Sequence, residues 1–203
     1  MALTLDHAVP SRSMTVHWML QELGEPFELR MVSIPNEEQK TANFRAINPM
    51  ARVPVLTHDH VVVTETSAIC AYLAAAFPDA RLGIPAGDPD HGAYLRWLFF
   101  AQGTAEPAIL WKALGKLTQS APIQPFADVD TVAEALRAHL ANHEYMAGDR
   151  FTAADVIIGA TIMWGTQLMP VLPESDEFKE YWGRLEARPA RQRAHQADMA
   201  RMT

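Results

Sequence analysis

The segment "RVPVL", residues 52–56, combines a strand-like pattern with a proline at its centre. Val53, Val55 and Leu56 are residues that β-sheets favour, whereas Pro54 cannot donate a hydrogen bond to a neighbouring strand. The proline also keeps Val53 extended. From these residues alone two interpretations stay open: an edge strand whose proline prevents aggregation, or a strand whose first peptide groups are left unpaired for a ligand.

Around this segment, the apolar pattern alternates between strands and helices up to about residue 77. The expected elements are strands at 2–7 and 27–34, helices at 13–24, 37–47 and 66–77, and a hairpin over 53–65 that turns at residues 58–60. This order predicts a compact α/β domain over residues 1–78.

The remainder of the chain has the pattern of a helical domain. Residues 78–90 are rich in proline, glycine and aspartate, which indicates a linker, placed at 79–89. Beyond it we expect an all-α domain over residues 90–203, with helices at 94–114, 128–143, 153–164 and 176–188 and a kink near Pro107. The helix at 153–164 is apolar on every face, so it should lie at the centre of this domain.

Composition restricts the classes of partner. The chain of 203 residues has 24 acidic and 17 basic residues, a net charge of −7 that argues against a nucleic-acid-binding protein. The single cysteine, Cys70, excludes a disulfide framework and fits a reducing compartment. Because we find neither a signal-peptide pattern nor an apolar run of about 18 residues, we expect a cytoplasmic protein without a membrane partner.

Four segments resemble motifs of the glutathione S-transferase superfamily, and they occur in the same order. They are "INPMARVPVL" (47–56), "TETSAICAYL" (64–73), "MAGDRFTAADVIIG" (146–159) and "LEARPA" (185–190). The resemblance, to the bacterial type with a serine catalytic group, implies a thioredoxin-like α/β domain followed by an all-α helical bundle. Two positions depart from the motifs: Met50-Ala51-Arg52 replaces x-Gly-Lys, and Thr66 stands where serine is more common.

The resemblance implies how glutathione, the co-substrate, is bound. The Val53–Pro54 bond would be cis, which turns the peptide groups of Val53 toward the cysteinyl backbone of glutathione as an added strand. Glu65 would pair with the ammonium of the γ-glutamyl group. Thr66, at a helix N-terminus, would hold its carboxylate, although an ordinary helix cap explains a threonine there as well.

A basic side chain would hold the glycine carboxylate of glutathione. The candidates are Arg52 and Lys40. A solvated surface charge explains either residue equally well.

The superfamily stabilises the glutathione thiolate between the first strand and the first helix. A free thiol has a pKa of about 8.5, and each unit of lowering requires about 1.4 kcal/mol. Alignment with serine-type members puts Ser11 at the catalytic position, and Ser13 is the alternative, as a catalytic group or as a helix cap. Tyr72, the first tyrosine, lies too far along the chain, and Cys70 lies inside a helix.

Two other patterns have structural explanations. Thr152-x-x-Asp155 is a capping box for the apolar helix that follows, rather than a catalytic pair. Histidine pairs occur at His58-x-His60 and at His139-x-x-x-His143, but without an evident third ligand we expect solvated histidines and no metal. His7 and His17 differ from these because they lie near the expected thiol site.

The resemblance implies a glutathione S-transferase that attacks a small hydrophobic electrophile, a homodimer with a role in detoxification. Two alternatives remain. One is a glutathione-dependent isomerase, dehalogenase or peroxidase, although Arg12 stands where the isomerase branch has a cysteine. The other is a glutathione- or ligand-binding protein without turnover, because one fold hosts several functions.

Overall fold

The computed structural model describes residues 2–115 and 127–202, and its contacts divide the chain into two compact units. Unit 1 comprises Met1–Leu82 and Arg188–Thr203, and unit 2 comprises Gly83–Ala187. The expected division of the chain assigned everything after residue 90 to the helical domain. The contacts instead group residues 188–203 with unit 1, because the last helix packs against the first one.

Unit 1 is built on a four-stranded mixed sheet in the order β2-β1-β3-β4. The strands are β1 (Leu3–His7), β2 (Phe27–Met31), β3 (Val55–His58) and β4 (Val61–Thr64). β1 and β2 are parallel, whereas β3 is antiparallel to both β1 and β4. Pro54 lies immediately before β3, so its missing N–H interrupts no hydrogen bond of the sheet.

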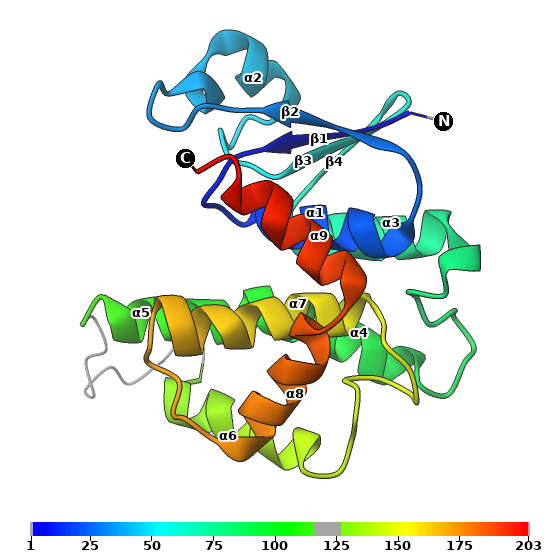
Figure 1. The fold of residues 1–203 in the computed structure, drawn as a ribbon, viewed down its shortest axis with the longest axis vertical. Helices are drawn as coiled ribbons and strands as arrows, with labels where there is room; N and C mark the ends of the chain where they lie inside the picture. Colours follow the sequence, from blue (N-terminus) through cyan, green and yellow to red (C-terminus); the bar gives the residue numbers. More distant parts are fainter. Residues whose placement is uncertain (1, 116–126, 203) are drawn as a thin grey trace. The chain divides into compact units, whose positions relative to one another are not determined.

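Helices cover both faces of this sheet (Figure 1). On one face lie α1 (Ser13–Leu23), α3 (Thr66–Ala76) and α9 (Pro189–Met199), and on the other lies the short α2 (Ala42–Ile47). α1 packs against both α3 and α9. The 3-10 turns η1 (Glu38–Lys40) and η2 (Pro78–Ala80) complete the unit.

The helix expected at 37–47 is two pieces, η1 and α2. Thr41 separates them because its backbone is extended (φ −62°, ψ 154°) and its side chain caps α2 by accepting a hydrogen bond from the N–H of Phe44. Threonine is a favoured N-cap residue, so the break has a local cause.

All regular secondary structure in the described residues of unit 2 is helical. It contains α4 (His91–Phe100), α5 (Glu106–Ala113), α6 (Val129–Leu140), α7 (Ala153–Met163) and α8 (Asp176–Glu186), with π-helical turns η3 (Ala101–Ala105) and η4 (Trp164–Leu168). α7 packs against α4 and α8 and is buried along most of its length, which confirms it as the central helix. No helix in the two described ranges is long and apolar enough to cross a membrane.

The long helix expected at 94–114 is interrupted by η3. This π-helical turn shifts the hydrogen-bond register before Pro107, which then lies in the first turn of α5. A proline is tolerated there because the first N–H groups of a helix have no partner within it.

The capping box of Thr152 and Asp155 is present and caps α7. Asp155 Oδ2 accepts a hydrogen bond from the N–H of Thr152 at 2.8 Å. Its Oδ1 accepts one from the N–H of Met146 at 2.8 Å and one from the hydroxyl of Tyr181 at 2.9 Å. Burial nevertheless raises the pKa of Asp155 to about 6. The structural interpretation of this pair is confirmed.

Candidate functional site

The segments that carry the predicted site residues leave the sheet of unit 1 at the same end of its strands. In the register of the sheet, Asp6 of β1 is opposite Val55 of β3, and Val55 is opposite Thr64 of β4. The loop after β1, the residues before β3 and the residues after β4 therefore begin next to one another. These segments carry the predicted site residues Ser11, Arg52, Val53, Pro54, Glu65 and Thr66.

The peptide bond between Val53 and Pro54 is cis, as expected. Pro54 is buried, and Val53 packs against the apolar cluster of Val32, Phe44 and Val55. This cluster fixes the position at which β3 begins.

The turn before this proline explains one departure from the superfamily motif. Ala51 has φ +53°, in the left-handed region that glycine adopts more readily than alanine. The side-chain amide of Asn48 donates a hydrogen bond to the carbonyl of Arg52 at 2.8 Å. The turn is therefore kept although its glycine is replaced.

Glu65 and Thr66 lie at the start of α3. Glu65 is exposed and has φ +70°, a conformation that a non-glycine residue rarely adopts and that is enriched at functional sites. Thr66 is the first residue of the helix and is buried. The N-terminus of a helix of this length attracts an anion through its N–H groups and its dipole.

The two basic candidates lie in different surroundings. Lys40, at the end of η1, forms a surface ion pair with Glu37, and both side chains are exposed. Arg52 is exposed and directly precedes Val53. Its position next to the cis bond favours Arg52, and the role of either residue stays a prediction.

Ser11 lies near the end of the β1–α1 loop and is partly exposed, whereas Ser13 is the first residue of α1 and is 0 % exposed. Their Oγ atoms lie 2.6 Å apart. Ser11 Oγ also accepts a hydrogen bond from the N–H of Ser13 at 3.1 Å and can donate one to the carbonyl of Ala8 at 2.7 Å. Ser13 Oγ accepts a hydrogen bond from the N–H of Ala8 at 3.0 Å.

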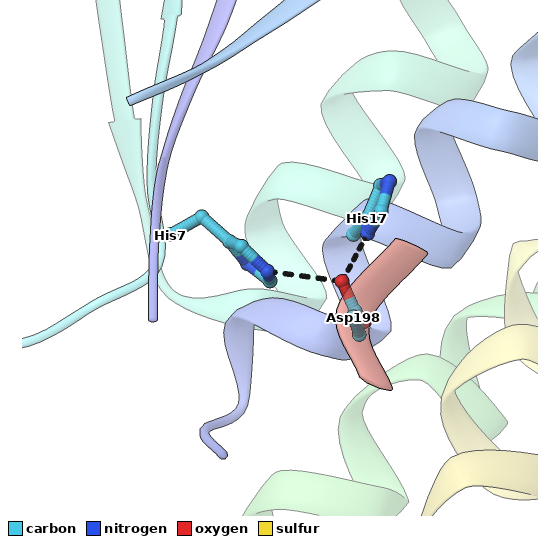
Figure 2. Close-up of side chains that lie close together, drawn as sticks. All are labelled: His7, His17 and Asp198. Carbon is cyan, nitrogen blue, oxygen red and sulfur yellow. Dashed lines mark hydrogen bonds and ion pairs between the residues drawn. The ribbon is translucent and has the colours of Figure 1, made fainter. Parts of the chain in front are cut away.

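A buried cluster of His7, His17 and Asp198 lies behind these serines, and Figure 2 shows that both imidazoles point toward the carboxylate. His7 ends β1, His17 lies on α1 and Asp198 lies on α9. Asp198 Oδ1 is 3.1 Å from His7 Nε2 and 2.6 Å from His17 Nδ1. Burial alone would raise the pKa of Asp198, but the hydrogen bonds with His17 and His7 lower it below its usual value.

The same three residues are of the types that bind metal ions, and among the described residues they are the group with suitable spacing. Ligand atoms around a tetrahedral zinc are held roughly 3.3 Å apart by bonds of about 2.0 Å. The contact of 2.6 Å between His17 and Asp198 is shorter and has the length of a hydrogen bond. The arrangement is therefore that of a hydrogen-bonded cluster.

Sequence reasoning missed Asp198. It placed His7 and His17 near the thiol site, but no local pattern in "ARQRAHQADMA" distinguishes this aspartate from a surface residue. The prediction that His58 is a solvated histidine is wrong. His58 is buried, and its Nδ1 lies 2.9 Å from the hydroxyl of Tyr72.

A cavity of about 610 Å³ adjoins the β1–α1 loop in unit 1. Residues 8–10 and 31–35 line it, together with Glu38 and Arg201. Most of this lining is apolar, so the cavity suits an apolar group more than a charged one.

Comparison with known proteins agrees with this geometry. The profile described as "Glutathione S-transferase, N-terminal domain" matches residues 11–76, and that described as "Glutathione S-transferase, C-terminal domain" matches residues 119–189. Glutathione S-transferase 1 of Schizosaccharomyces pombe is 30% identical over 166 residues, covering 76% of this chain and 70% of that protein. The chain belongs to the glutathione S-transferase family.

Solved structures of the glutathione S-transferase family share the fold. The glutathione transferase URE2P5 from Phanerochaete chrysosporium superposes with a TM-score of 0.81 at 22% identity, covering 98% of this chain and 96% of that one. The theta class glutathione S-transferase from Xanthomonas axonopodis pv. citri, solved with glutathione bound, superposes with a TM-score of 0.76 at 26% identity, covering 95% and 96%.

The expected fold of this glutathione S-transferase is thus confirmed in both parts. A thioredoxin-like mixed sheet with helices on both faces forms the first, and a helical bundle forms the second. Cys70 is fully buried in α3, and burial raises the pKa of its thiol far above the usual value, which agrees with its exclusion as a catalytic group.

Proposed function

We propose that this member of the family binds glutathione along the sheet edge formed by Val53, Glu65 and Thr66 and transfers it to a small hydrophobic electrophile. The observation that carries the proposal is the register of the sheet, which brings these residues next to the loop with Ser11. Such transfer would serve the detoxification of electrophiles.

Each binding residue would meet a different part of glutathione. The N–H and C=O of Val53 would pair with the cysteinyl backbone as an added strand. The carboxylate of Glu65 would pair with the ammonium group, and the hydroxyl and N–H of Thr66 would hold the γ-glutamyl carboxylate at the N-terminus of α3. Arg52 or Lys40 would hold the glycine carboxylate.

Ser11 is the better candidate for the group that stabilises the thiolate. It is partly exposed and can be reached by a ligand, whereas Ser13 is 0 % exposed. A hydroxyl donor beside a helix N-terminus supplies a lowering of the thiol pKa of about one to two units. The thiolate then attacks the electrophile by addition or substitution.

Isothermal titration of glutathione tests the binding part of this proposal. We expect saturable binding to the native protein and weaker binding to Thr66→Ala, because the variant loses one hydrogen bond to a charged carboxylate, worth about 1.5–3 kcal/mol. Thr131→Ala, an exposed threonine in the first turn of α6, is the matched control and should bind as the native protein does. Absence of binding at several millimolar would contradict the proposal.

Ser11→Ala tests the catalytic part. We expect turnover with an activated aryl halide to fall strongly while glutathione affinity is kept, because the interaction is with the thiolate. A protein that only carries glutathione would have no turnover to lose. Unchanged turnover in Ser11→Ala would contradict the assignment of this serine.

We further infer a homodimer that uses the exposed apolar residues of α4 and α5. Phe99 is 58 % exposed and Leu110 is 39 % exposed, and exposed apolar residues that form a contiguous patch mark protein–protein interfaces. Sedimentation of the native protein and of Phe99→Glu tests this, with a dimer expected for the first and a shift toward monomer for the second.

A further inference from the structure

A continuous chain of hydrogen-bonding atoms connects Ser11 to Asp198. Ser11 Oγ lies 2.6 Å from Ser13 Oγ, and Ser13 Oγ lies 2.8 Å from His7 Nδ1. His7 Nε2 in turn lies 3.1 Å from Asp198 Oδ1. Each separation is within the range of a hydrogen bond, so protons can pass along these atoms from Ser11 to His7, which Asp198 contacts from the far side.

Of the hydrogen-bonded residues from Ser11 to Asp198, only Ser11 is accessible to solvent. Ser13 and His7 are 0 % exposed and Asp198 is 1 % exposed, whereas Ser11 is partly exposed. A proton that enters at Ser11 is therefore held in the protein. Burying two histidines and a carboxylate carries a cost of desolvation that apolar residues in the same space would not carry.

The groups around His7 determine which of its atoms carry protons. Asp198 is ionised at neutral pH, since its pKa is lowered, and it therefore accepts a hydrogen bond from the N–H at Nε2 of His7. Nδ1 of neutral His7 is then an acceptor for the hydroxyl of Ser13. His17 is the other titratable group that contacts His7, and Asp6, next to His7 on β1, is paired with Arg30 on β2.

This inference rests on the function proposed above. We propose that His7 receives the proton of the glutathione thiol through Ser11 and Ser13. Asp198 orients the imidazole of His7, and His17 fixes the carboxylate of Asp198. His7, Asp198 and His17 act through the two serines and are positioning residues. The ligand that these hydrogen-bonded residues serve is a thiol bound beside Ser11.

The step balances within the site. The S–H proton passes to Ser11 Oγ as the Ser11 proton passes to Ser13 Oγ and the Ser13 proton passes to His7 Nδ1. The thiol becomes a thiolate and neutral His7 becomes an imidazolium beside the Asp198 carboxylate. Afterwards each hydroxyl donates toward the sulfur, so the same atoms that remove the proton stabilise the anion.

Asp198 has the role that the aspartate plays in a Ser-His-Asp triad. It orients the imidazole, fixes its tautomer and stabilises the imidazolium without becoming protonated. The contact of 2.6 Å between His17 Nδ1 and Asp198 Oδ1 fixes the carboxylate from a second side. A carboxylate held by two donors keeps a lowered pKa although it is buried.

Proton counting in the native protein tests this inference without a variant. Titrations of glutathione in buffers of different ionisation enthalpy give the protons released on binding, and ultraviolet difference absorbance gives the thiolate formed. S-methylglutathione, which has no ionisable thiol, supplies the baseline for all other groups. We expect more thiolate than released protons, and equal amounts would overturn the inference.

Variants give a second test. Asp198→Asn and His7→Gln should raise the pKa of the bound thiol by about one unit, which is tenfold less thiolate at a pH below that pKa. At a pH below that pKa, glutathione affinity should change less than about twofold, because neither residue contacts the ligand and most of the bound thiol stays protonated. Arg193→Ala, an exposed residue on the same helix that contacts Gln21 of α1, is the matched control and should keep the native thiol pKa.

The outcomes separate the two proposals. A protein that binds no glutathione contradicts the proposed function. Binding with a native thiol pKa in both Asp198→Asn and His7→Gln overturns only the relay. If both variants fail to fold, the proton count of the native protein still decides the question.

Discussion

The guanidinium of Arg188 forms two hydrogen bonds with the carboxylate of Glu22, Nε to Oε1 at 2.7 Å and Nη2 to Oε2 at 2.8 Å. Arg188 directly precedes α9, and Glu22 lies in the last turn of α1. The indole N–H of Trp18 donates to the same carboxylate at 2.9 Å. This planar ion pair with two hydrogen bonds attaches the start of α9, the helix that carries Asp198, to the end of α1.

Arg188→Met should destabilise unit 1 by about 2 kcal/mol, because it leaves the largely buried carboxylate of Glu22 without its cation. Exposed ion pairs contribute about 0–1 kcal/mol, so a larger loss identifies the buried partner as the cause. Urea unfolding measures the loss, and amide hydrogen exchange should show it in α9. The double variant Glu22→Gln, Arg188→Met should recover part of it, and a cost below about 0.5 kcal/mol for the single variant contradicts the prediction.

Asp155 should make unit 2 more stable at mildly acidic pH than at neutral pH. Its pKa of about 6 in the folded protein lies above its unfolded value, so the folded state binds the proton more tightly. This contribution is present below about pH 4 and is lost as the pH rises through about 6, up to about 3 kcal/mol in all.

Comparison with Asp155→Asn isolates this contribution, because the other titrating groups are common to both proteins. The variant should be less stable at every pH, since its amide nitrogen faces hydrogen-bond donors. The difference in unfolding free energy should shrink from about pH 4 to about pH 7. A difference that grows over this range would mean that the hydrogen bonds to Asp155 outweigh burial.

Gly165→Ala should destabilise the protein by about 1–3 kcal/mol through overpacking. A Cβ at this position would lie 2.5 Å from Leu172 Cδ1 and 2.9 Å from Ile109 Cδ1, closer than carbon atoms approach. Gly183→Ala on α8 is the control, because a Cβ there meets nothing within 4 Å. It should stabilise the helix by about 0.5–1 kcal/mol, and thermal unfolding of the two variants should therefore shift in opposite directions.

Cys70 should react with an alkylating reagent only when the protein opens. Burial raises the pKa of its thiol far above the usual value, so the reactive thiolate is absent from the folded state. Alkylation followed by mass spectrometry should show slow modification in buffer and fast modification in urea. Rapid modification in buffer would show that α3 is mobile.

The local parts of the fold were predictable from the sequence because their causes are local. The proline before β3, the N-cap at Thr152 and the apolar faces of α7 act through neighbouring residues. The split of residues 37–47 was missed because the competing cap, Thr41, was read as a helix residue. The π-helical turn η3 was missed because apolar spacing does not distinguish it from an α-helix.

The candidate site divides in the same way. Val53, Glu65 and Thr66 were predicted through motifs next to one another in the sequence, and Ser11 through its place between a strand and a helix, and these roles stay predictions. Asp198 contacts His7 across 191 positions of sequence. Only the packing of α9 on α1 brings them together, and a single sequence contains no signal for that packing.

Unit 1 is discontinuous along the chain, since residues 83–187 separate α9 from α1, against which it packs. During synthesis on the ribosome, the sheet, α1 and α3 emerge long before the helix that completes them. The nascent unit therefore has an open flank at α1 until unit 2 has been translated, a period in which a chaperone could bind. The histidines at that flank stay hydrated until Asp198 arrives, so the buried carboxylate cluster forms only at the end of folding.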